Sequence, residues 1–504
     1  MLRSFHAWCA LQPLAALTVI ALVPRLIAAF FSEGYFAHDD HFLVIEAAAS
    51  WVDGFDYNNW LPWNQTGTPH PSGHSFVYVG LHYVLFSGLK LIGLGSPKAI
   101  MLIVRSIHAI WSLVVVRAGY RIALRLASPE IAWRAGLFLA LFYFMPFLAV
   151  RNLVEVACIP FLMLGAYRLV RSPEGPSLKD AFVAGLWIGL AVNIRFQTLF
   201  FAVGPGLAFL LQKRWKEAVV YGLGATLPIV LLQGSIDLFI WSAPFAELTE
   251  YVGYNLVNTT TYFDQPWYNY LLLLAGIYIP FLSVAVLFGI FRKTSPLLLW
   301  IPLMLFLAVH SYFPNKQERF LLPIVPLFFV VGYAAWEQWR SRSSWWQQHI
   351  GLWKGQMVFV VALNTILLVV LCGTFSKRSR VEAMDLLRTE TPLRRLIMED
   401  TVEGEPPLPP LFYLGQWNVS VLFVLDPKEP IPSVDPTQKR MDRPDGILFF
   451  GMEDLPQRMA RVIAATGPLE VVAVARPGLV DRVVHWLNPV NRNEAILVTR
   501  TVAN

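Results

Sequence analysis

Two adjacent carboxylates, Asp39 and Asp40, form the stretch of this chain that is best suited to chemistry. Imidazoles flank them at His38 and His41, and a further acid, Glu46, follows shortly after. Paired acids beside imidazoles can accept or donate a proton in a reaction, which hydrophobic packing does not require. The plainer alternative is that the aspartates cap a short helix. We interpret Asp39 and Asp40 as candidate catalytic residues and Glu46 as a supporting residue.

A second set of polar residues is cationic and occurs where apolar segments end. Arg195 follows one apolar run, and a turn between two others holds His310, Lys316 and Arg319. Such groups are frequent partners of phosphate, so these four are candidate phosphate ligands. The alternatives are an arginine with its stem along apolar surface and its head in water, and a turn that only orients the chain. Glu318 is expected to be buried beside Arg319 as a hydrogen-bonded pair.

Four further residues are candidates for supporting the site or binding an acceptor. Arg151 and Glu155 have the i, i+4 spacing of a helical ion pair, which fits a structural pair as well as a phosphate contact. Asp237 and Asn255 lie in or beside apolar segments. Ionisable groups inside a membrane cost about 2.5–3.5 kcal/mol each on insertion scales, so a cluster of them indicates a function. No Asp-x-Asp pair or His/Cys cluster demands a metal, and neither a metal nor a cofactor is expected.

These residues belong to a chain that is 56% hydrophobic and only 15% charged. Soluble domains carry about 25% charged residues, and this chain contains many apolar runs of about 17–25 residues. We therefore expect an all-α polytopic membrane protein. The net charge of +6 is modest and indicates basic cytoplasmic loops rather than binding to nucleic acid. The three cysteines are scattered and predict no disulfide framework.

The positions of Lys and Arg between the apolar runs predict the topology, because these residues accumulate in cytoplasmic loops. With the N-terminus in the cytoplasm, roughly 11–12 transmembrane helices follow. The segment 75–94 fits either a full crossing or an interfacial position. The candidate residues then gather on the non-cytoplasmic side. The expected spans are 8–31, 98–118, 135–150, 154–170, 181–194, 196–212, 218–240, 267–291, 296–310, 320–339 and 355–374.

This topology divides the chain into a membrane domain, residues 1–375 with outer loops 32–74 and 241–266, and a small soluble extracytoplasmic α/β domain, residues 376–504. In the first loop, Asp39 to Trp51 predict a short amphipathic helix, with its apolar residues on the membrane surface. These apolar residues are Phe42, Ile45 and Ala49. The expected strands of the soluble domain are Leu411–Leu414, Gly446–Phe450, Leu469–Ala475 and Ile496–Val498.

The order of these motifs resembles that of glycosyltransferase family 22, the polyprenyl- or dolichyl-phosphate-mannose-dependent mannosyltransferases with a GT-C fold. The outer-loop motif of that family, Pro-Asp-Glu-x-Phe with a later Glu, is similar to the stretch from His38 to Phe42 with Glu46. Its His-Lys-Glu-Glu-Arg-Phe-x-x-Pro motif is similar to the stretch from Asn315 to Pro323. The other matches follow in family order within about residues 35–330 and are Arg151-Asn152 with Glu155, Arg195-Phe196-Gln197-Thr198, Ile236-Asp237, Tyr254-Asn255 and Pro266-Trp267-Tyr268-Asn269-Tyr270.

The resemblance implies an inverting hexosyltransferase that moves a sugar, mannose in that family, from a polyprenyl-phosphate donor to a glycan, lipid or protein acceptor on the non-cytoplasmic face. It implies that Asp39 is the base, or Asp40 if the loop is shifted, and that the four cations hold the donor phosphate. A transporter or flippase of lipid-linked sugars is the alternative, against which the sequence shows no internal inverted repeat. Membrane lipids are the surrounding partners. A bacterial cytoplasmic membrane is the expected location, with the endoplasmic reticulum as the alternative.

Overall fold

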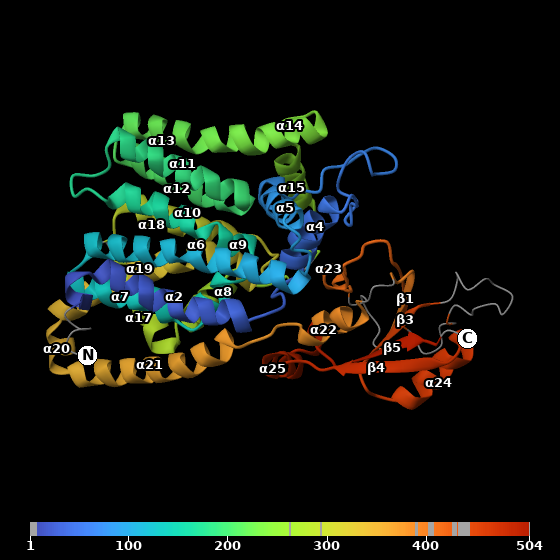
Figure 1. Ribbon diagram of the computed structural model, residues 1–504. Coiled ribbons are helices and arrows are strands. Elements are labelled where there is room, and N and C mark those ends of the chain that lie inside the picture. Colours follow the sequence, from blue (N-terminus) through green and yellow to red (C-terminus); the bar gives the residue numbers. More distant parts are fainter. Residues whose placement is uncertain are drawn as a thin grey trace. The chain divides into compact units, whose positions relative to one another are not determined.

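The structure, a computed structural model, describes residues 8–261, 264–292, 295–388, 392–401, 408–425, 431 and 444–502. The chain divides into two units (Figure 1). Unit 1 comprises Met1–Phe30, Asn59–Leu81 and Val104–Gly373, and unit 2 comprises Phe31–Asn58, His82–Ile103 and Thr374–Asn504. The expected soluble tail therefore shares unit 2 with the acidic segment around Asp39, whereas the four candidate cations belong to unit 1.

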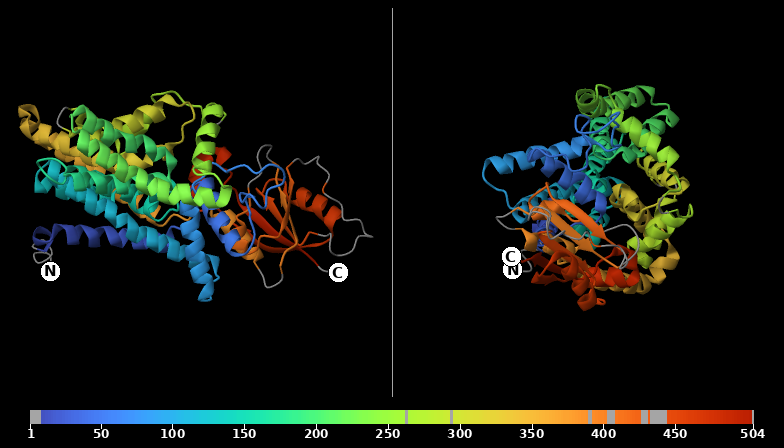
Figure 2. Two further views of the ribbon diagram at one scale, coloured as in Figure 1. Left: turned by 90° about the horizontal axis from the view of Figure 1, so that it is seen from above. Right: turned by 90° about the vertical axis from the view of Figure 1, so that its right-hand side faces the viewer.

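Unit 1 is helical, and Figure 2 shows that most of its long helices run roughly along one common direction. Three of its helices also contribute residues to unit 2: α2 with its last residue, Phe31, and α5 and α6 with longer segments. The elements are α2 (Pro13–Phe31), α5 (Phe76–Leu91), α6 (Pro97–Leu126), α7 (Pro129–Leu141), α8 (Phe144–Ala149), α9 (Val154–Ala157), α10 (Ile159–Val170), α11 (Leu178–Ile194), η2 (Phe196–Thr198), α12 (Leu199–Leu211), α13 (Trp215–Pro228), η3 (Ile229–Gly234), α14 (Ser235–Trp241), α15 (Ala246–Val257), α16 (Asn269–Ile277), α17 (Pro280–Ile290), α18 (Leu297–Tyr312), η4 (Glu318–Ile324), α19 (Val325–Arg342), α20 (Ser344–Gln348) and α21 (Ile350–Cys372).

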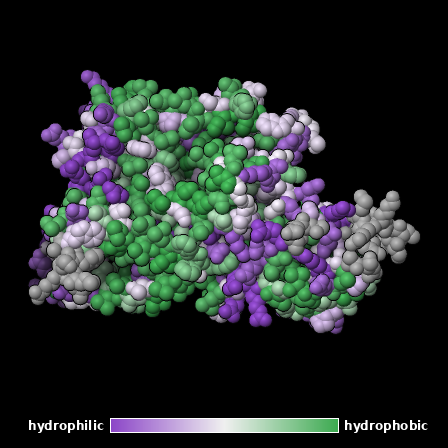
Figure 3. All heavy atoms as spheres, in the orientation of Figure 1, coloured by the Kyte–Doolittle hydropathy of each residue, from purple (hydrophilic) through white to green (hydrophobic). Residues whose placement is uncertain are grey.

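The expected integral membrane protein is confirmed by apolar helices of membrane-spanning length. Within the described residues, 5 helices are long and apolar enough to cross a membrane. They are Pro13–Phe31, Pro97–Leu126, Trp215–Trp241, Glu318–Arg342 and Ile350–Cys372. Shorter apolar helices occupy Phe76–Leu91, Phe196–Leu211 and Leu297–Tyr312. Figure 3 shows the side chains on this face of the helical unit as largely hydrophobic, as contact with lipid tails requires.

The expected span over 267–291 is sharply bent within the described residues. The segment forms two helices, α16 and α17, which are bent by 120° relative to each other. Pro280 opens α17, and Ile279 before it has a positive φ of 66°. Proline has no N–H to continue the hydrogen bonds of the preceding helix, so the chain turns at this point. The segment expected to span therefore consists of two helices of 9 and 11 residues that meet at this bend.

Helix α11 begins at a serine cap and packs closely against α13. The Ser177 hydroxyl accepts a hydrogen bond from the N–H of Asp180, which satisfies one of the unpaired donors of the first turn. Gly185 and Gly189 face α13, where an added Cβ would lie 2.3 Å from the Tyr221 carbonyl oxygen and 2.2 Å from that of Ala225. This small-xxx-small spacing lets two backbones approach in a membrane. It fixes the end of α11, from which Arg195 follows.

Unit 2 contains a five-stranded sheet with the strand order β2-β1-β3-β5-β4. The first three strands in this order are parallel, β5 is antiparallel to β3, and β4 is antiparallel to β5. Val462 of α24 packs on a core that includes Ile397, Ile447 and Phe449. The elements are α3 (His38–Asp40), η1 (His41–Glu46), α4 (Ala47–Val52), α22 (Arg378–Leu387), β1 (Arg395–Glu399), α23 (Leu411–Leu414), β2 (Ser420–Val424), β3 (Gly446–Phe450), α24 (Leu455–Thr466), β4 (Leu469–Ala475), α25 (Leu479–Leu487), η6 (Pro489–Asn491) and β5 (Ile496–Thr501).

Three of the four expected strands are confirmed as β3, β4 and β5, and β1 and β2 were not foreseen. The fourth expectation, a strand at Leu411–Leu414, is wrong because this segment forms the single turn α23. Pro410 precedes the turn, and Gly415 closes it in the left-handed conformation with φ 76°. The Gly415 N–H then bonds the Leu411 carbonyl, a common way to end a helix.

Within unit 2, the segment that follows α2 pairs with the segment that follows α21. The Ser32 hydroxyl donates to the Thr374 carbonyl at 3.0 Å, and the Ser376 N–H donates to the Glu33 carbonyl at 3.0 Å. Gly34 has φ +75°, and an added Cβ would lie 1.8 Å from the Ser376 carbonyl oxygen. Only glycine fits both the conformation and the space at this position.

Candidate functional site

The acidic segment forms one continuous helical stretch, α3, η1 and α4, from His38 to Val52. The expected helix is confirmed, but its middle turn is a π-helix, which is frequent at functional sites. The expected contact of its apolar residues with the membrane surface is wrong, because Phe42, Ile45 and Ala49 are only 1%, 1% and 7% exposed. Phe42 lies against the rings of Tyr35 and His38 instead, at centroid distances of 5.7 and 4.4 Å.

The structure separates the two adjacent acids by their surroundings. Asp40 is buried, and its Oδ2 accepts a hydrogen bond from the Ala37 N–H at 3.1 Å. Asp39 is partly exposed. The capping alternative therefore describes Asp40, and Asp39 is the acid with better access to a substrate.

Glu46 and His41 form a buried pair that fixes the acidic segment. Both side chains are almost fully buried, and His41 Nε2 lies 3.0 Å from Glu46 Oε1. The Phe412 N–H donates to the same oxygen at 3.0 Å. The His41 ring stacks with the ring of Tyr35 at a centroid distance of 4.7 Å and with the ring of Tyr413 at 5.4 Å. Burial raises the pKa of Glu46, and the hydrogen bonds from His41 and Phe412 oppose this shift. Glu46 therefore positions the helix that carries Asp39.

In unit 1, two arginines converge on one fully buried carboxylate, Glu155. Arg195 Nη2 lies 3.1 Å from Glu155 Oε1, and Arg319 Nε lies 3.9 Å from the same oxygen. Each guanidinium also donates a hydrogen bond through Nε to a nearby glutamine. Arg195 donates to Gln197 at 3.1 Å, and Arg319 donates to Gln317 at 2.7 Å. The glutamines hold the planes of the two guanidiniums in place.

Two guanidiniums, those of Arg195 and Arg319, face the single carboxylate of Glu155. Both cations also lie over the ring of Phe320, at 5.2 Å for Arg195 and 5.5 Å for Arg319. Their side chains are 14% and 9% exposed. Because the two guanidiniums are partly shielded from water, they attract an anion more strongly than a surface arginine does. The cluster is therefore suited to a phosphate group.

The other two predicted phosphate ligands, His310 and Lys316, make hydrogen bonds to backbone carbonyl groups. His310 Nδ1 lies 2.8 Å from the Phe306 carbonyl, so Nδ1 carries a proton and Nε2 can bind an anion only when it is also protonated. Lys316 Nζ donates to the Gln265 carbonyl at 3.0 Å and to the Phe313 carbonyl. Burial lowers the pKa of Lys316. We therefore assign Lys316 to fastening its loop.

The structure changes the expectation for Glu318 and places Arg151 against an aromatic ring. Glu318 is exposed, so the expectation that it is buried beside Arg319 is wrong, and Glu155 is the carboxylate that faces Arg319. Helix η4 begins at Glu318 and directs this side chain away from the core. Arg151 is buried, and its guanidinium lies 4.4 Å from the centroid of the Phe147 ring.

Asp237 and Asn255 have structural partners in the described residues. Asp237 is fully buried, accepts from Gln233 Nε2 at 2.8 Å and accepts from the Glu247 N–H at 3.1 Å. It therefore caps the start of α15. Asn255 donates to the Tyr251 carbonyl one helical turn earlier, at 2.8 Å.

Glu247 fixes the segment from Ser72 to His74, and it was not among the residues predicted from the sequence. Its Oε2 accepts hydrogen bonds from the Ser72 hydroxyl at 3.0 Å and from the N–H groups of Gly73 and His74 at 2.6 and 3.2 Å. Its Oε1 accepts from Trp241 Nε1 at 2.9 Å. Burial raises the pKa of Glu247 to about 7. The sequence offered one signal for Glu247, its position near the end of an apolar segment. The residues at 72–74 that bond to it are far away in the sequence.

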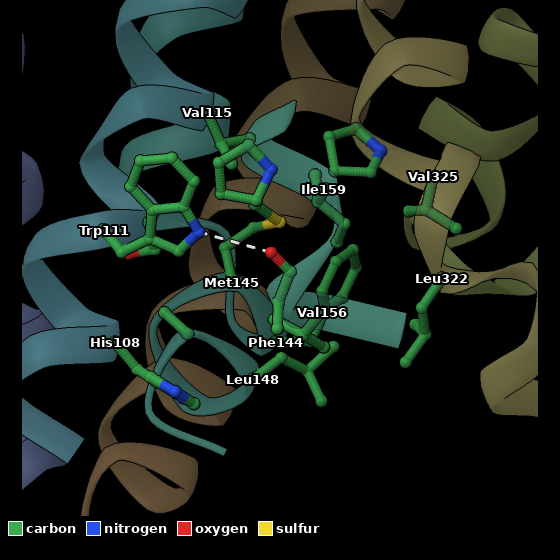
Figure 4. A pocket seen from close by; sticks show the side chains of 15 residues that line it. His108, Trp111, Val115, Phe144, Met145, Leu148, Val156, Ile159, Leu322 and Val325 are labelled. Carbon is green, nitrogen blue, oxygen red and sulfur yellow. Dashed lines mark hydrogen bonds between the residues drawn. The ribbon is translucent and has the colours of Figure 1, made fainter. Parts of the chain in front are cut away.

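An apolar pocket borders the elements that carry the arginine cluster (Figure 4). Val156 follows Glu155 directly, and Leu322 lies one turn beyond Arg319. On another side, Trp111 Nε1 donates to the Ala157 carbonyl at 3.2 Å. The space open to water in it is about 30 Å³, which exceeds the roughly 10–15 Å³ that one water molecule needs.

Comparisons with known proteins agree with this fold. Two crystal structures of ArnT from Cupriavidus metallidurans share the fold. The one bound to undecaprenyl phosphate has a TM-score of 0.63 and 13% identity, over 98% of this chain and 99% of that chain. The apo structure has a TM-score of 0.60 and 14% identity, over 97% of this chain and 98% of that chain.

Among curated proteins, "Mannosyltransferase APTG1" of Arabidopsis thaliana is 22% identical over 65% of this chain and 59% of its own length. "GPI alpha-1,2-mannosyltransferase 3" of Mus musculus is 22% identical over 75% of this chain and 67% of its own length. The match thus covers less than two thirds of the plant protein.

A helical membrane unit of this kind, with a small α/β unit, defines a protein of the GT-C class, as the ArnT fold does. The model of the Alg9-like mannosyltransferase family matches residues 16–401, and this chain belongs to that family. The expected enzyme class is confirmed at the level of the family, whose curated relatives are named mannosyltransferases. The match extends from before the acidic segment to beyond Arg319.

Proposed function

We propose that this protein transfers a mannose residue from a polyprenyl-phosphate donor to an acceptor glycan, lipid or protein, with inversion at the anomeric carbon. The single observation that carries the proposal is the arginine pair around Glu155, in a chain of a mannosyltransferase family. Two largely buried guanidiniums can stabilise the charge of the phosphate that leaves in such a transfer. A solved ArnT that shares the fold is described as bound to undecaprenyl phosphate, which supports a donor of this chemical class.

The proposed reaction needs a proton acceptor and a stabilised leaving group. The Asp39 carboxylate takes the proton of an acceptor hydroxyl, whose oxygen then forms a bond to the anomeric carbon. The bond between that carbon and the phosphate oxygen breaks, and the phosphate keeps the electron pair. Arg195 and Arg319 stabilise the charge that develops on the phosphate. Positioned proton acceptance contributes about 10²–10⁴-fold to a rate.

The remaining candidates have supporting parts in this proposal. Glu46 and His41 hold the helix that presents Asp39, and Asp40 closes its first turn. Lys316 and Glu247 each fasten a loop that adjoins an apolar segment. We place the site on the non-cytoplasmic face, because the basic turns between apolar segments suit the cytoplasm. A bacterial cytoplasmic membrane remains our proposed location, with the endoplasmic reticulum as the alternative.

The test is transfer of radiolabelled mannose by the purified full chain in lipid nanodiscs, from polyprenyl-phosphate mannose to extracted lipid-linked glycans. Asp39→Asn should lower transfer about 10²–10⁴-fold while donor binding persists. Asp53→Asn is the matched control, because Asp53 lies in the same unit and forms an exposed pair with Lys90. Unchanged transfer by Asp39→Asn would contradict the assignment of the base.

The same variants distinguish a transferase from a transporter of lipid-linked sugars. A flippase moves its lipid across a bilayer without breaking the sugar–phosphate bond. Reconstituted wild-type protein that moves the labelled donor between leaflets, forms no product and is insensitive to Asp39→Asn would therefore favour transport.

A further inference from the structure

Helix α25, labelled in Figure 1, presents its apolar side chains to the outside of the protein. Leu479, Val483, Trp486 and Leu487 are 64%, 47%, 79% and 68% exposed. Their spacing of i, i+4, i+7 and i+8 puts them on one face of the helix. A surface helix of a soluble domain has the reverse arrangement, with its apolar stripe toward the core.

The polar face of α25 is the one that is bonded to the protein. Asp481 is buried, and its carboxylate accepts hydrogen bonds from the N–H groups of Lys377 and Arg378, both at 3.0 Å. Asn493 donates through its N–H to His485 Nδ1 at 3.4 Å and through Nδ2 to the Asp481 carbonyl at 3.3 Å. These contacts fix the rotation of the helix, so the apolar stripe stays outward.

The chain also ties α25 to the end of a membrane-spanning helix. Lys377, whose N–H bonds Asp481, is the fifth residue after Cys372, the last residue of α21. Five residues of backbone span at most about 18 Å. Helix α21 is one of the helices long and apolar enough to cross a membrane. This short connection and the hydrogen bond from Lys377 to Asp481 together restrict the start of α25 to the neighbourhood of the membrane surface at which α21 ends.

We propose that α25 lies in the interfacial layer of the membrane that α21 crosses, with its apolar stripe in the upper acyl region. A lipid surface suits a helix with apolar side chains on one face and a polar opposite face. Trp486 suits the boundary between headgroups and acyl chains. Arg482, exposed beside Val483, has a long side chain that can reach lipid phosphates. The α/β part of unit 2 would thus be held at the bilayer at a second point besides α21.

The test uses an environment-sensitive fluorophore on single cysteines in the full-length protein, reconstituted in nanodiscs. Val483→Cys and Leu487→Cys label the apolar stripe, and Gln457→Cys labels an exposed position of α24 in the same domain as a control. Cys9 is replaced by serine, because it is the partly exposed cysteine among the three, and the other two are buried. Lipids with a nitroxide near the top of the acyl chain then quench the probes that contact them.

The proposal predicts blue-shifted emission at positions 483 and 487, a severalfold loss of that emission with nitroxide lipids, and little quenching at position 457. Equal and weak quenching at all three positions would overturn it. A blue shift that nitroxide lipids leave unchanged and that varies with the number of protein copies per disc would also overturn it, because contact with a second copy would then cover the stripe. Three independent variants, each with one exposed cysteine, keep the result interpretable if one of them fails to fold.

Discussion

Replacing Arg319 by glutamine should weaken donor binding more than it weakens the fold. Arg319 Nε lies 3.9 Å from Glu155 Oε1, whereas Arg195 Nη2 lies 3.1 Å from the same atom. Arg195 therefore remains to pair with Glu155 after the change. Breaking a buried pair completely costs about 3–5 kcal/mol, and the remaining arginine should avoid most of that cost.

The loss of donor affinity follows from the contacts that a guanidinium makes with phosphate. Each hydrogen bond to a charged group contributes about 1.5–3 kcal/mol. One lost bond then corresponds to roughly 10- to 150-fold weaker binding, since 1.4 kcal/mol is a factor of ten. Arg319→Lys should be intermediate, because it keeps the charge but not the planar fork that bonds two oxygens.

The assay is competition of unlabelled against radiolabelled polyprenyl phosphate for the protein in nanodiscs, with thermal unfolding measured in parallel. Arg134→Gln is the matched control, because Arg134 pairs with Glu337 in unit 1 at 3.2 Å and has a side chain that is 54% exposed. It should leave donor affinity unchanged.

A double variant, Glu155→Gln with Arg319→Gln, separates phosphate binding from simple charge compensation. If Arg319 only neutralises Glu155, the double variant restores both stability and donor affinity. If Arg319 binds the phosphate, stability recovers and affinity stays low. Normal donor affinity in Arg319→Gln, or its full recovery in the double variant, would refute the reasoning.

Two further predictions concern the loops around the site. Gly34→Ala should destabilise the protein strongly, because its Cβ would overlap the Ser376 carbonyl oxygen. At Gly54, φ is +81° and nothing lies within 4 Å of an added Cβ. Gly54→Ala should therefore cost only about 1–2 kcal/mol of backbone strain. Thermal unfolding of both variants measures the difference, and equal shifts would show that the contact at Gly34 is unimportant. The pKa of Glu247 is raised to about 7 by burial, so its protonated form favours the folded state. The contribution of protonated Glu247 to the free energy of unfolding is complete below the usual carboxyl pKa and is lost as the pH rises through about 7. Stability should therefore fall over this interval in the wild type and change less in Glu247→Gln, and identical pH profiles would contradict the assignment.

Local patterns in the sequence predicted the elements whose signals are short-range. The helix after Asp39 follows from its polar start and its apolar spacing, and the strand at Gly446–Phe450 follows from a short apolar run. The segment Leu411–Leu414 has the same apolar character, but Pro410 and Gly415 enclose it in a single helical turn. Apolar character alone cannot separate a short strand from a short helix.

The candidate site shows a second limit of sequence reasoning. The i, i+4 rule directs attention from Glu155 to Arg151, but in the structure Glu155 faces Arg195 and Arg319, which come from distant parts of the chain. The residue types and their cationic character were predictable from apolar segments that end in charge. The pairing was not, because it depends on how α9, η2 and η4 pack.

The most direct test of the account is a structure of the protein in nanodiscs with a non-reactive donor analogue and an acceptor. The account predicts guanidinium nitrogens of Arg195 and Arg319 about 2.7–2.9 Å from the donor phosphate oxygens. It also predicts the Asp39 carboxylate about 2.6–3.2 Å from the acceptor hydroxyl of the same complex. A donor phosphate bound away from both arginines, or Asp39 on the opposite side of the membrane from that phosphate, would contradict it.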